Sequence, residues 1–425
     1  MRFTHIVASI LLLTFLLTPL TGVFAAHTTK SSVATPTSNQ TLVELREYIA
    51  RVTESQNGTP LTPLELRQSI QEGTRWIKNA QFGKGQFHYE YNPYADTYSK
   101  DDNIVRQAGT LYALTEVLRR DDADPYNLTR AVEESLEYFE RISKKGTYEG
   151  TSFMCVASHG ASTRCELGAT ALVLTAILGF IEHAPGKKSE YGDLMEAYRS
   201  FILAMQKRNG GFRSLYLIGR TEQPDGESPF ANGEALLALT RLALFNEKDT
   251  AVKTSVDRAL TYLTKQPFDT AFYLWGMAAL KDVARMDPKR IDLTYVTDFT
   301  LWRIERGTLV RNTNKNFCAY TEGLVSALSL LKNTIPLPTY TTIYNEAIHG
   351  VRKNRALQLT VDNPTRAFMG DRGFILETYV RPLRAAGGFL TGESDTDRVQ
   401  RIDYTQHCVS ASLQMLTDVH GEKLY

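Results

Sequence analysis

From residue 62 onward, the chain alternates between two kinds of predicted helix, and this alternation constrains the fold more than any other feature. The first kind carries apolar residues on one face, as helices at a protein surface do. The second kind is apolar nearly all round, which requires burial on every side. The first kind is expected at 62–80, 127–142, 191–206, 251–265, 291–304 and 340–357, and the second at 102–118, 165–181, 232–245, 271–284, 318–331 and 405–419. Strict alternation predicts six helical hairpins with the second kind inside.

Glycine recurs within five of the predicted inner helices. A glycine inside a helix costs about 1 kcal/mol relative to alanine, so its recurrence indicates positions where two backbones approach closely. Helix pairs that repeat at intervals of about 45 to 65 residues are typical of a closed or stacked helical repeat. The five residues are Gly109, Gly168, Gly233, Gly276 and Gly323.

The long connections all precede an inner helix, whereas the connections that follow one are short, as at 119–126 and 246–250. If the inner helices run parallel in a ring, the long loops gather at one end, and long loops in compact domains are usually functional. Glycine followed by alternating aromatic residues in two of these loops predicts short β-hairpins over the ring mouth. The long connections are 81–101, 146–164, 207–231, 305–317 and 358–404.

Six hairpins in two shells, with glycine-bearing inner helices and loops in which glutamine precedes glycine and phenylalanine, resemble the (α/α)6 toroid. Two superfamilies have that shape: the six-hairpin glycosidases with related sugar lyases and epimerases, and the terpenoid cyclase and prenyltransferase toroids. The loop from Gln206 to Phe212 is similar to the cyclase repeat but lacks its tryptophan. The resemblance implies an all-α, single-domain (α/α)6 toroid over 61–425 with short β-hairpin loops over one end.

The first residues predict export. A basic Arg2, an uncharged run over 6–26 and the sequence Val23-Phe24-Ala25 are typical of a secretory signal peptide, expected at 1–25. Residues 26–60 are expected to form a flexible linker with a short helix. The mature protein is therefore expected to be secreted or periplasmic, with membrane association only if the apolar run remains uncleaved.

Charge argues against nucleic acid as a partner. The chain has 48 basic and 47 acidic residues, a formal net charge of +1. It has no basic tract of the kind that binds a phosphate backbone.

The four cysteines are expected to pair in an oxidising compartment. Cys155 with Cys165 would close a short loop. Cys318 and Cys408 both lie at the start of inner helices that are neighbours in a ring, which favours a second disulfide. The alternative is a zinc site formed by Cys318, His407, Cys408 and a fourth ligand. The disulfide is preferred, so no metal and no cofactor are expected.

Candidate site residues follow from the predicted ring mouth. Two carboxylates on either side of a glycosidic bond act as acid and as base or nucleophile. Arginines suit the carboxylate of a uronic acid, and a tyrosine or histidine suits proton transfer at its C5. The catalytic candidates are Asp102, Glu322, Tyr98, Glu166 and His407, and the substrate-binding candidates are Tyr89, Tyr91, Arg106, His159, Arg164, Glu234 and Tyr320.

These residues favour an exported carbohydrate-active enzyme, a glycoside hydrolase, lyase or uronate epimerase that acts on an oligosaccharide or polysaccharide. Each acid also has a structural interpretation, because Asp102 suits a helix start and pairs at four residues with Arg106. Two alternatives therefore remain open: a non-catalytic toroid that binds glycans or peptides, and a terpenoid cyclase or prenyltransferase-like toroid.

Overall fold

The computed structural model describes residues 61–120, 124, 126–158, 163–311, 315–370, 373–394 and 396–425. The predicted signal peptide, the linker and His159 lie outside these residues. The described residues belong to one compact unit.

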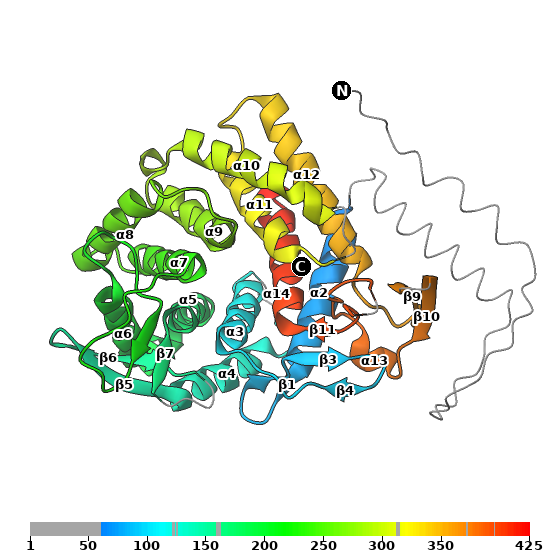
Figure 1. The fold of residues 1–425 in the computed structure, drawn as a ribbon, viewed down its shortest axis with the longest axis horizontal. Coiled ribbons are helices and arrows are strands. Elements are labelled where there is room, and N and C mark those ends of the chain that lie inside the picture. Colours follow the sequence, from blue (N-terminus) through cyan, green and yellow to red (C-terminus); the bar gives the residue numbers. More distant parts are fainter. Residues whose placement is uncertain are drawn as a thin grey trace, which may run out of the picture. The chain divides into compact units, whose positions relative to one another are not determined.

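Six inner helices form a closed ring (Figure 1). Each helix contacts the next one along the chain, and the last contacts the first. The predicted all-α (α/α)6 toroid is thereby confirmed. The inner helices are α3 (Ile104–Leu118), α5 (Leu167–His183), α7 (Pro229–Phe245), α9 (Thr270–Met286), α11 (Cys318–Leu331) and α14 (Ile402–Gln414), the last continued by the π-helical turn η4 (Met415–Val419).

Six outer helices surround this ring, and each contacts one or more inner helices. Their apolar faces point inward, as the periodicity predicts. Both the number of hairpins and their approximate bounds agree with the sequence prediction. The outer helices are α2 (Pro63–Ala80), α4 (Leu128–Ile142), α6 (Lys188–Met205), α8 (Thr250–Leu263), α10 (Leu293–Arg311) and α12 (Leu337–Ala356).

Local signals set the helix starts. Thr62 caps α2 in a capping box: its hydroxyl accepts from the Glu65 amide at 3.2 Å, and the Glu65 carboxylate accepts from the Thr62 amide at 2.8 Å. Asn103 caps α3, where its side-chain oxygen accepts from the Arg106 amide at 3.2 Å. This cap fixes the first turn of α3, which carries Arg106.

The repeated glycines are contact points between inner helices. A Cβ added at Gly233 would lie 2.7 Å from Cβ of Trp275 on α9, and one at Gly323 would lie 2.8 Å from the ring of Tyr273. Contacts this short are too close for a real Cβ atom, so only glycine allows the spacing of the ring.

Short strands cover the end where the inner helices begin. The strands β1 (Gln81–Phe82) and β2 (Gln86–Phe87) form a predicted hairpin. In the loop before α7, however, β8 (Leu215–Leu217) pairs with β7 (Arg164–Glu166) from the loop before α5. The remaining strands form the sheet β11-β3-β4 and two hairpins, from β3 (Glu90–Asn92), β4 (Thr97–Tyr98), β5 (Ser143–Tyr148), β6 (Thr151–Val156), β9 (Thr365–Gly370), β10 (Gly373–Thr378) and β11 (Gln400–Arg401). Three short helical pieces, η2 (Pro185–Lys187), η3 (Pro288–Arg290) and α13 (Pro382–Ala385), complete the connections.

Toward the other end of the inner helices, the interior of the ring holds paired charges. The Arg241 guanidinium on α7 contacts Glu116 on α3 at 3.0 Å and also Asp282 on α9. Burial opposes ionisation of Glu116, but the charges of Arg119 and Arg241 outweigh it and hold the pKa of that carboxyl well below its usual value. The pairs therefore join three inner helices through their side chains.

Both predicted disulfides are present. Cys155 and Cys165 are bonded with their Cα atoms 5.8 Å apart, and Cys318 and Cys408 with theirs 4.8 Å apart. The second bond joins α11 to α14 and removes the thiolates that the alternative zinc site requires. None of the helices in the described ranges is both long enough and apolar enough to cross a bilayer.

Candidate active site

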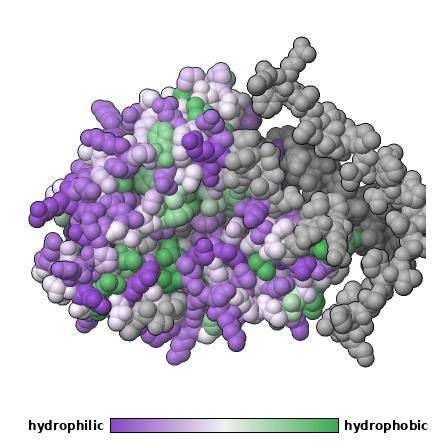
Figure 2. All heavy atoms as spheres, in the orientation of Figure 1, coloured by the Kyte–Doolittle hydropathy of each residue, from purple (hydrophilic) through white to green (hydrophobic). Residues whose placement is uncertain are grey.

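A cavity of about 700 Å³ opens at the end where the inner helices begin. This volume lies within the usual range for small-molecule sites. The face drawn in Figure 2 is hollowed near its centre, where apolar and polar residues meet. The charged and titratable lining residues are Arg106, Arg164, Glu166, Glu234, Asp403 and His407, and the aromatic ones are Phe230, Trp275, Phe317 and Tyr404.

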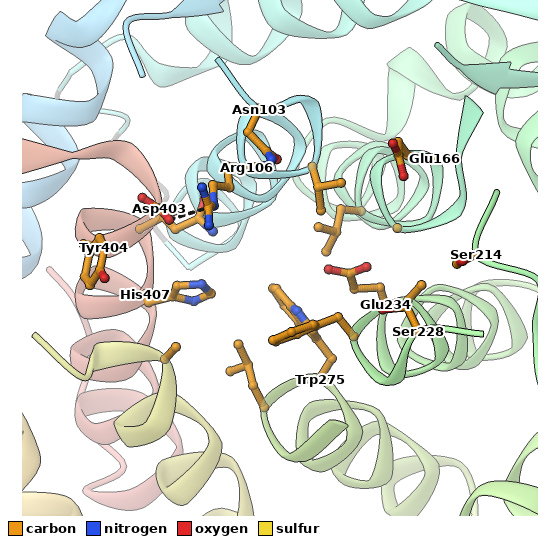
Figure 3. Close-up of a pocket in the computed structure, with 18 of the residues that line it drawn as sticks. Asn103, Arg106, Glu166, Ser214, Ser228, Glu234, Trp275, Asp403, Tyr404 and His407 are labelled. Atoms are coloured by element: carbon orange, nitrogen blue, oxygen red, sulfur yellow. Dashed lines mark hydrogen bonds and ion pairs between the residues drawn. The ribbon is translucent and has the colours of Figure 1, made fainter. Parts of the chain in front are cut away.

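Glu234 on α7 is a buried acid that faces the cavity (Figure 3). It is 4% exposed, and no group in the described part of the chain donates a hydrogen bond to its carboxyl. Burial and the nearby charge of Glu166 raise its pKa to about 8. At neutral pH it is therefore mostly protonated and able to donate a proton.

Gly168 on α5 makes room for this acid. A Cβ at Gly168 would overlap the Oε2 atom of Glu234. The backbone of Gly168 forms the wall against which the Glu234 carboxyl lies. At this position the repeated glycine therefore shapes the cavity as well as the contact between inner helices.

Glu166 lies on the same side of the cavity as Glu234 (Figure 3). Its Oε1 atom accepts from Ser158 Oγ at 3.1 Å and contacts Arg164 Nη2 at 3.0 Å. Strand β7 carries both Arg164 and Glu166, with the disulfide-bonded Cys165 between them. Glu166 is thus a paired carboxylate beside an unpaired acid.

His407 on α14 lies across the cavity from Glu234, with Trp275 between them in the view of Figure 3. The Nδ1 atom of His407 is 2.7 Å from Oε2 of Glu322, which is 1% exposed. Burial raises the pKa of Glu322, while the bond to His407 and the charge of Lys281 oppose that rise. When Glu322 is ionised it accepts the Nδ1 proton, so Nε2 of His407 is left as a proton acceptor.

Ion pairs order a third part of the mouth. Asp403 on α14 contacts Arg106 Nε at 2.9 Å and Arg401 Nη2 at 2.7 Å. Arg106 also donates to the Tyr89 hydroxyl. Burial and the Asp403 charge raise the pKa of Tyr89, so its hydroxyl stays protonated at neutral pH.

The structure brings together seven of the residues predicted from the sequence. Five line the cavity, Glu322 lies behind His407, and Tyr89 lies behind Arg106. The five lining residues are Arg106, Arg164, Glu166, Glu234 and His407.

Four other predicted residues do not line this cavity. The carboxylate of Asp102 accepts from Gln86 and Gln107, each at 2.8 Å, and so holds the first loop against α3. The remaining three are Tyr98, whose ring stacks on His88 at 3.8 Å, Tyr91, which donates to Asp96 at 3.0 Å, and Tyr320, which donates to Glu346 at 3.0 Å.

Sequence reasoning missed several lining residues, chiefly Asp403, Trp275, Phe230 and Tyr404. Two of them carried a signal. Trp275 immediately precedes the repeat glycine of its helix, and Asp403 is four residues before His407, which places both on one helix face. Phe230 and Tyr404 had no comparable signal because neither belongs to a repeat.

No family model matches the chain, and no curated protein matches it. Solved structures share its fold. A sugar epimerase from a ruminal bacterium has a TM-score of 0.58 at 11% identity, covering 84% of this chain and 99% of its own. A D-mannose isomerase has a TM-score of 0.57 at 10% identity, covering 83% and 97%. A GH76 α-mannanase from Bacteroides thetaiotaomicron has a TM-score of 0.51 at 9% identity, covering 89% and 98%.

These likenesses show the fold, and the neighbours are six-hairpin, glycosidase-like toroids. The predicted (α/α)6 toroid architecture is therefore confirmed. The three solved structures named above are carbohydrate-active enzymes.

Proposed function

We propose that the protein is a carbohydrate-active enzyme that moves protons on a sugar held between His407 and Glu234. The observation that carries the proposal is the facing pair itself: a buried, protonated carboxylic acid and a histidine whose Nδ1 is bonded to a buried carboxylate. An acid and a base on opposite sides of a bound substrate are the requirement for general acid–base catalysis.

The pair best fits isomerisation between an aldose and a ketose. Nε2 of His407 removes the proton from the carbon beside the carbonyl group while Glu234 gives its proton to the carbonyl oxygen, which produces an enediol. The proton on Nε2 then passes to the neighbouring carbon, and Glu234 recovers a proton from the hydroxyl oxygen. A single base suffices for this transfer, and His407 is the one histidine among the described lining residues.

The walls of the cavity suit a sugar. The indole ring of Trp275, whose centroid is 5.8 Å from that of His407, offers an apolar surface beside the base. The Arg106–Asp403 pair offers a donor and an acceptor to hydroxyl groups. Among the solved neighbours, the D-mannose isomerase and the sugar epimerase act on sugars by name, which supports the same class of substrate.

A second reaction is favoured by the neighbouring carboxyls. Burial and, after it, the charge of Glu166 raise the pKa of Glu234, which leaves one acid protonated beside one that is paired with Arg164. One protonated and one ionised carboxyl are the pair used in glycoside hydrolysis, in which the protonated acid gives its proton to the leaving oxygen. In this reading Glu166, rather than His407, is the second catalytic group.

One NMR experiment in D2O distinguishes the two reactions. The mature protein is incubated with a panel of aldoses, ketoses and neutral and uronic oligosaccharides. Isomerisation produces a new sugar of the same composition, with deuterium on carbon wherever the proton on Nε2 exchanges with D2O before it is passed on, whereas hydrolysis produces shorter sugars with new reducing ends and no deuterium on carbon. Binding that raises the melting temperature without any product would instead indicate the non-catalytic toroid.

Variants assign the roles. We expect His407→Asn and Glu234→Gln each to lower kcat by about 100-fold to 10,000-fold, the usual contribution of a positioned acid or base. Glu166→Gln is expected to do the same only if the reaction is hydrolysis. Asp102→Asn is the matched control, because that carboxylate lies outside the cavity lining and holds a loop. A loss in Asp102→Asn equal to that in His407→Asn would contradict this assignment.

Export is part of the proposal. Two disulfides support an oxidising compartment, as expected for a chain with a cleaved signal peptide. N-terminal sequencing of the protein recovered outside the cytoplasm is expected to begin after Ala25.

A further inference from the structure

Behind His407, a series of polar side chains continues into the ring. Glu322 Oε1 is 3.5 Å from the amide nitrogen of Gln414. The Gln414 oxygen accepts from Lys281 Nζ at 2.6 Å, and Lys281 also contacts Asp418 at 2.9 Å. The series thus joins the cavity to charges on α9 and at the end of α14.

The orientation of the Gln414 amide is determined by its donors. Its oxygen accepts from Lys281 and also from Ser326 Oγ at 2.8 Å. An amide oxygen that accepts two donors turns its NH2 group the other way. The NH2 group therefore faces Glu322, where it offers a hydrogen to a carboxylate.

The groups facing Glu322 come from three inner helices. From α14 come His407 and Gln414, from α9 Lys281, and from α3 the carboxylate Glu116 and the hydroxyl of Tyr112. Glu116 is itself neutralised by arginines. Apart from His407 itself, Lys281, which also pairs with Asp418 at 2.9 Å, is the positive charge that favours the ionised form of Glu322.

Whether Glu322 is ionised decides which nitrogen of His407 carries the proton. An ionised Glu322 accepts from Nδ1–H, and Nε2 is then free to act as a base. A buried carboxyl without a nearby cation takes up a proton instead. A protonated Glu322 would donate to Nδ1, so a neutral His407 would carry its hydrogen on Nε2 and could accept nothing from the substrate.

We propose that Lys281 and Gln414 are positioning residues that keep Glu322 ionised and so keep the proton of His407 on Nδ1. Neither residue is among those lining the cavity, so both act through Glu322. The consequence for catalysis rests on the proposed function, whereas the proton position on His407 does not.

The test is NMR of the full mature chain with ¹⁵N-labelled histidine at neutral pH. Long-range proton–nitrogen correlations distinguish the two neutral tautomers, and His407→Asn identifies the signal. We expect Nδ1–H in the native protein and Nε2–H in Lys281→Met. Lys281→Arg, which keeps the charge, is expected to restore Nδ1–H.

Lys332→Met is the matched control. Lys332 is a more exposed lysine that donates to the Val419 carbonyl at 2.9 Å, near the same end of α14, and none of its described contacts is with Glu322. The His407 signal is expected to be unchanged in this variant. If Lys332→Met moved the signal as far as Lys281→Met does, a general loosening of α14 would explain both and the proposal would be overturned.

Gln414→Met provides a second route, since it keeps the Lys281–Asp418 pair that stabilises this region. It is expected to raise the Nε2–H population in the same direction, to a smaller extent. An unchanged tautomer in Lys281→Met, or in Gln414→Met if the lysine variant does not fold, overturns the proposal.

With an active substrate, the acid limb of the kcat profile is expected to move to higher pH in Lys281→Met while KM stays constant. A tautomer shift in a protein without activity would uphold the inference and reject only the proposed function.

Discussion

Glu234 combines two features that rarely occur together in a carboxyl group: it is 4% exposed, and no described group donates to it. The ionised form is therefore disfavoured, with a pKa of about 8. A group of this kind destabilises the folded chain at alkaline pH. Its retention is explained if the protonated form is needed at the cavity wall, which is the role proposed above.

Glu234→Gln is expected to change the pH dependence of stability. The folded-state pKa of Glu234 is raised above the unfolded value of 4.5, so the folded chain binds more protons than the unfolded chain between pH 4.5 and about 8. The stabilisation is complete below 4.5 and is lost as the pH rises through that window. As the pH rises from about 5 to about 7.5, the free energy of unfolding of the glutamine variant should therefore increase by on the order of 3 kcal/mol relative to that of the native protein. Urea unfolding of both proteins at both pH values measures this gain. If the free energies of unfolding of the two proteins changed equally with pH, the raised pKa of Glu234 would be contradicted.

The inner helix α5 carries one glycine at the site and another away from it. A Cβ at Gly168 would overlap the Glu234 carboxyl, whereas one at Gly179 would meet Thr115 Oγ1 at an ordinary 3.4 Å. The two positions share a helix, with Gly168 in its first turn and Gly179 in its interior. They therefore separate the effect on the site from the effect on the helix.

Gly179→Ala is expected to stabilise the protein by up to about 1 kcal/mol. Gly168→Ala is expected to fold, because the overlapped atom is the end of a flexible side chain, but to lose at least about 10-fold in activity as the Glu234 carboxyl is displaced. Urea midpoints and kcat for both variants provide the comparison. Full activity in Gly168→Ala would show that the precise place of Glu234 does not matter.

At the scale of the whole molecule, each of the two disulfides lies next to a residue that lines the cavity. Cys165 adjoins Glu166, and Cys408 adjoins His407. They differ in the length of chain they enclose, with sequence separations of 10 and 90 residues. In the chain-entropy account, a longer enclosed segment gives more stabilisation.

Replacing the Cys318–Cys408 pair by alanines is expected to lower the free energy of unfolding by roughly 4 to 5 kcal/mol, and replacing Cys155–Cys165 by roughly 2 to 3 kcal/mol. Urea unfolding of the two double variants at one pH is the measurement. A larger loss for the Cys155–Cys165 pair would mean that local strain or packing, rather than chain entropy, determines the contribution of these bonds.

Periodicity was enough to predict the twelve helices of the ring, their division into two shells and the end at which the long loops gather, where the cavity opens. An amphipathic or all-apolar pattern is a property of consecutive residues, so it is present in the sequence whatever the neighbours are. The Cys318–Cys408 disulfide followed from the same information, since the predicted inner helices that carry these two residues are neighbours in a ring, although α14 begins at Ile402 and places Cys408 in its middle. The glycine repeat likewise indicated close contacts, although not which side chain each glycine meets.

The membership of the site depended on the folded ring. Asp102 and Asp403 both lie near the start of an inner helix, yet Asp102 accepts from Gln86 and Gln107 while Asp403 meets Arg106 at the mouth. Nothing local distinguishes them, because the direction of a side chain at a helix end depends on which loop lies over it. Likewise, Tyr91 belongs to β3, the central strand of the β11-β3-β4 sheet, and its side chain is buried there instead of lining the cavity. Helices form from contacts a few residues apart, whereas a cavity forms between segments that are brought together only when the ring closes.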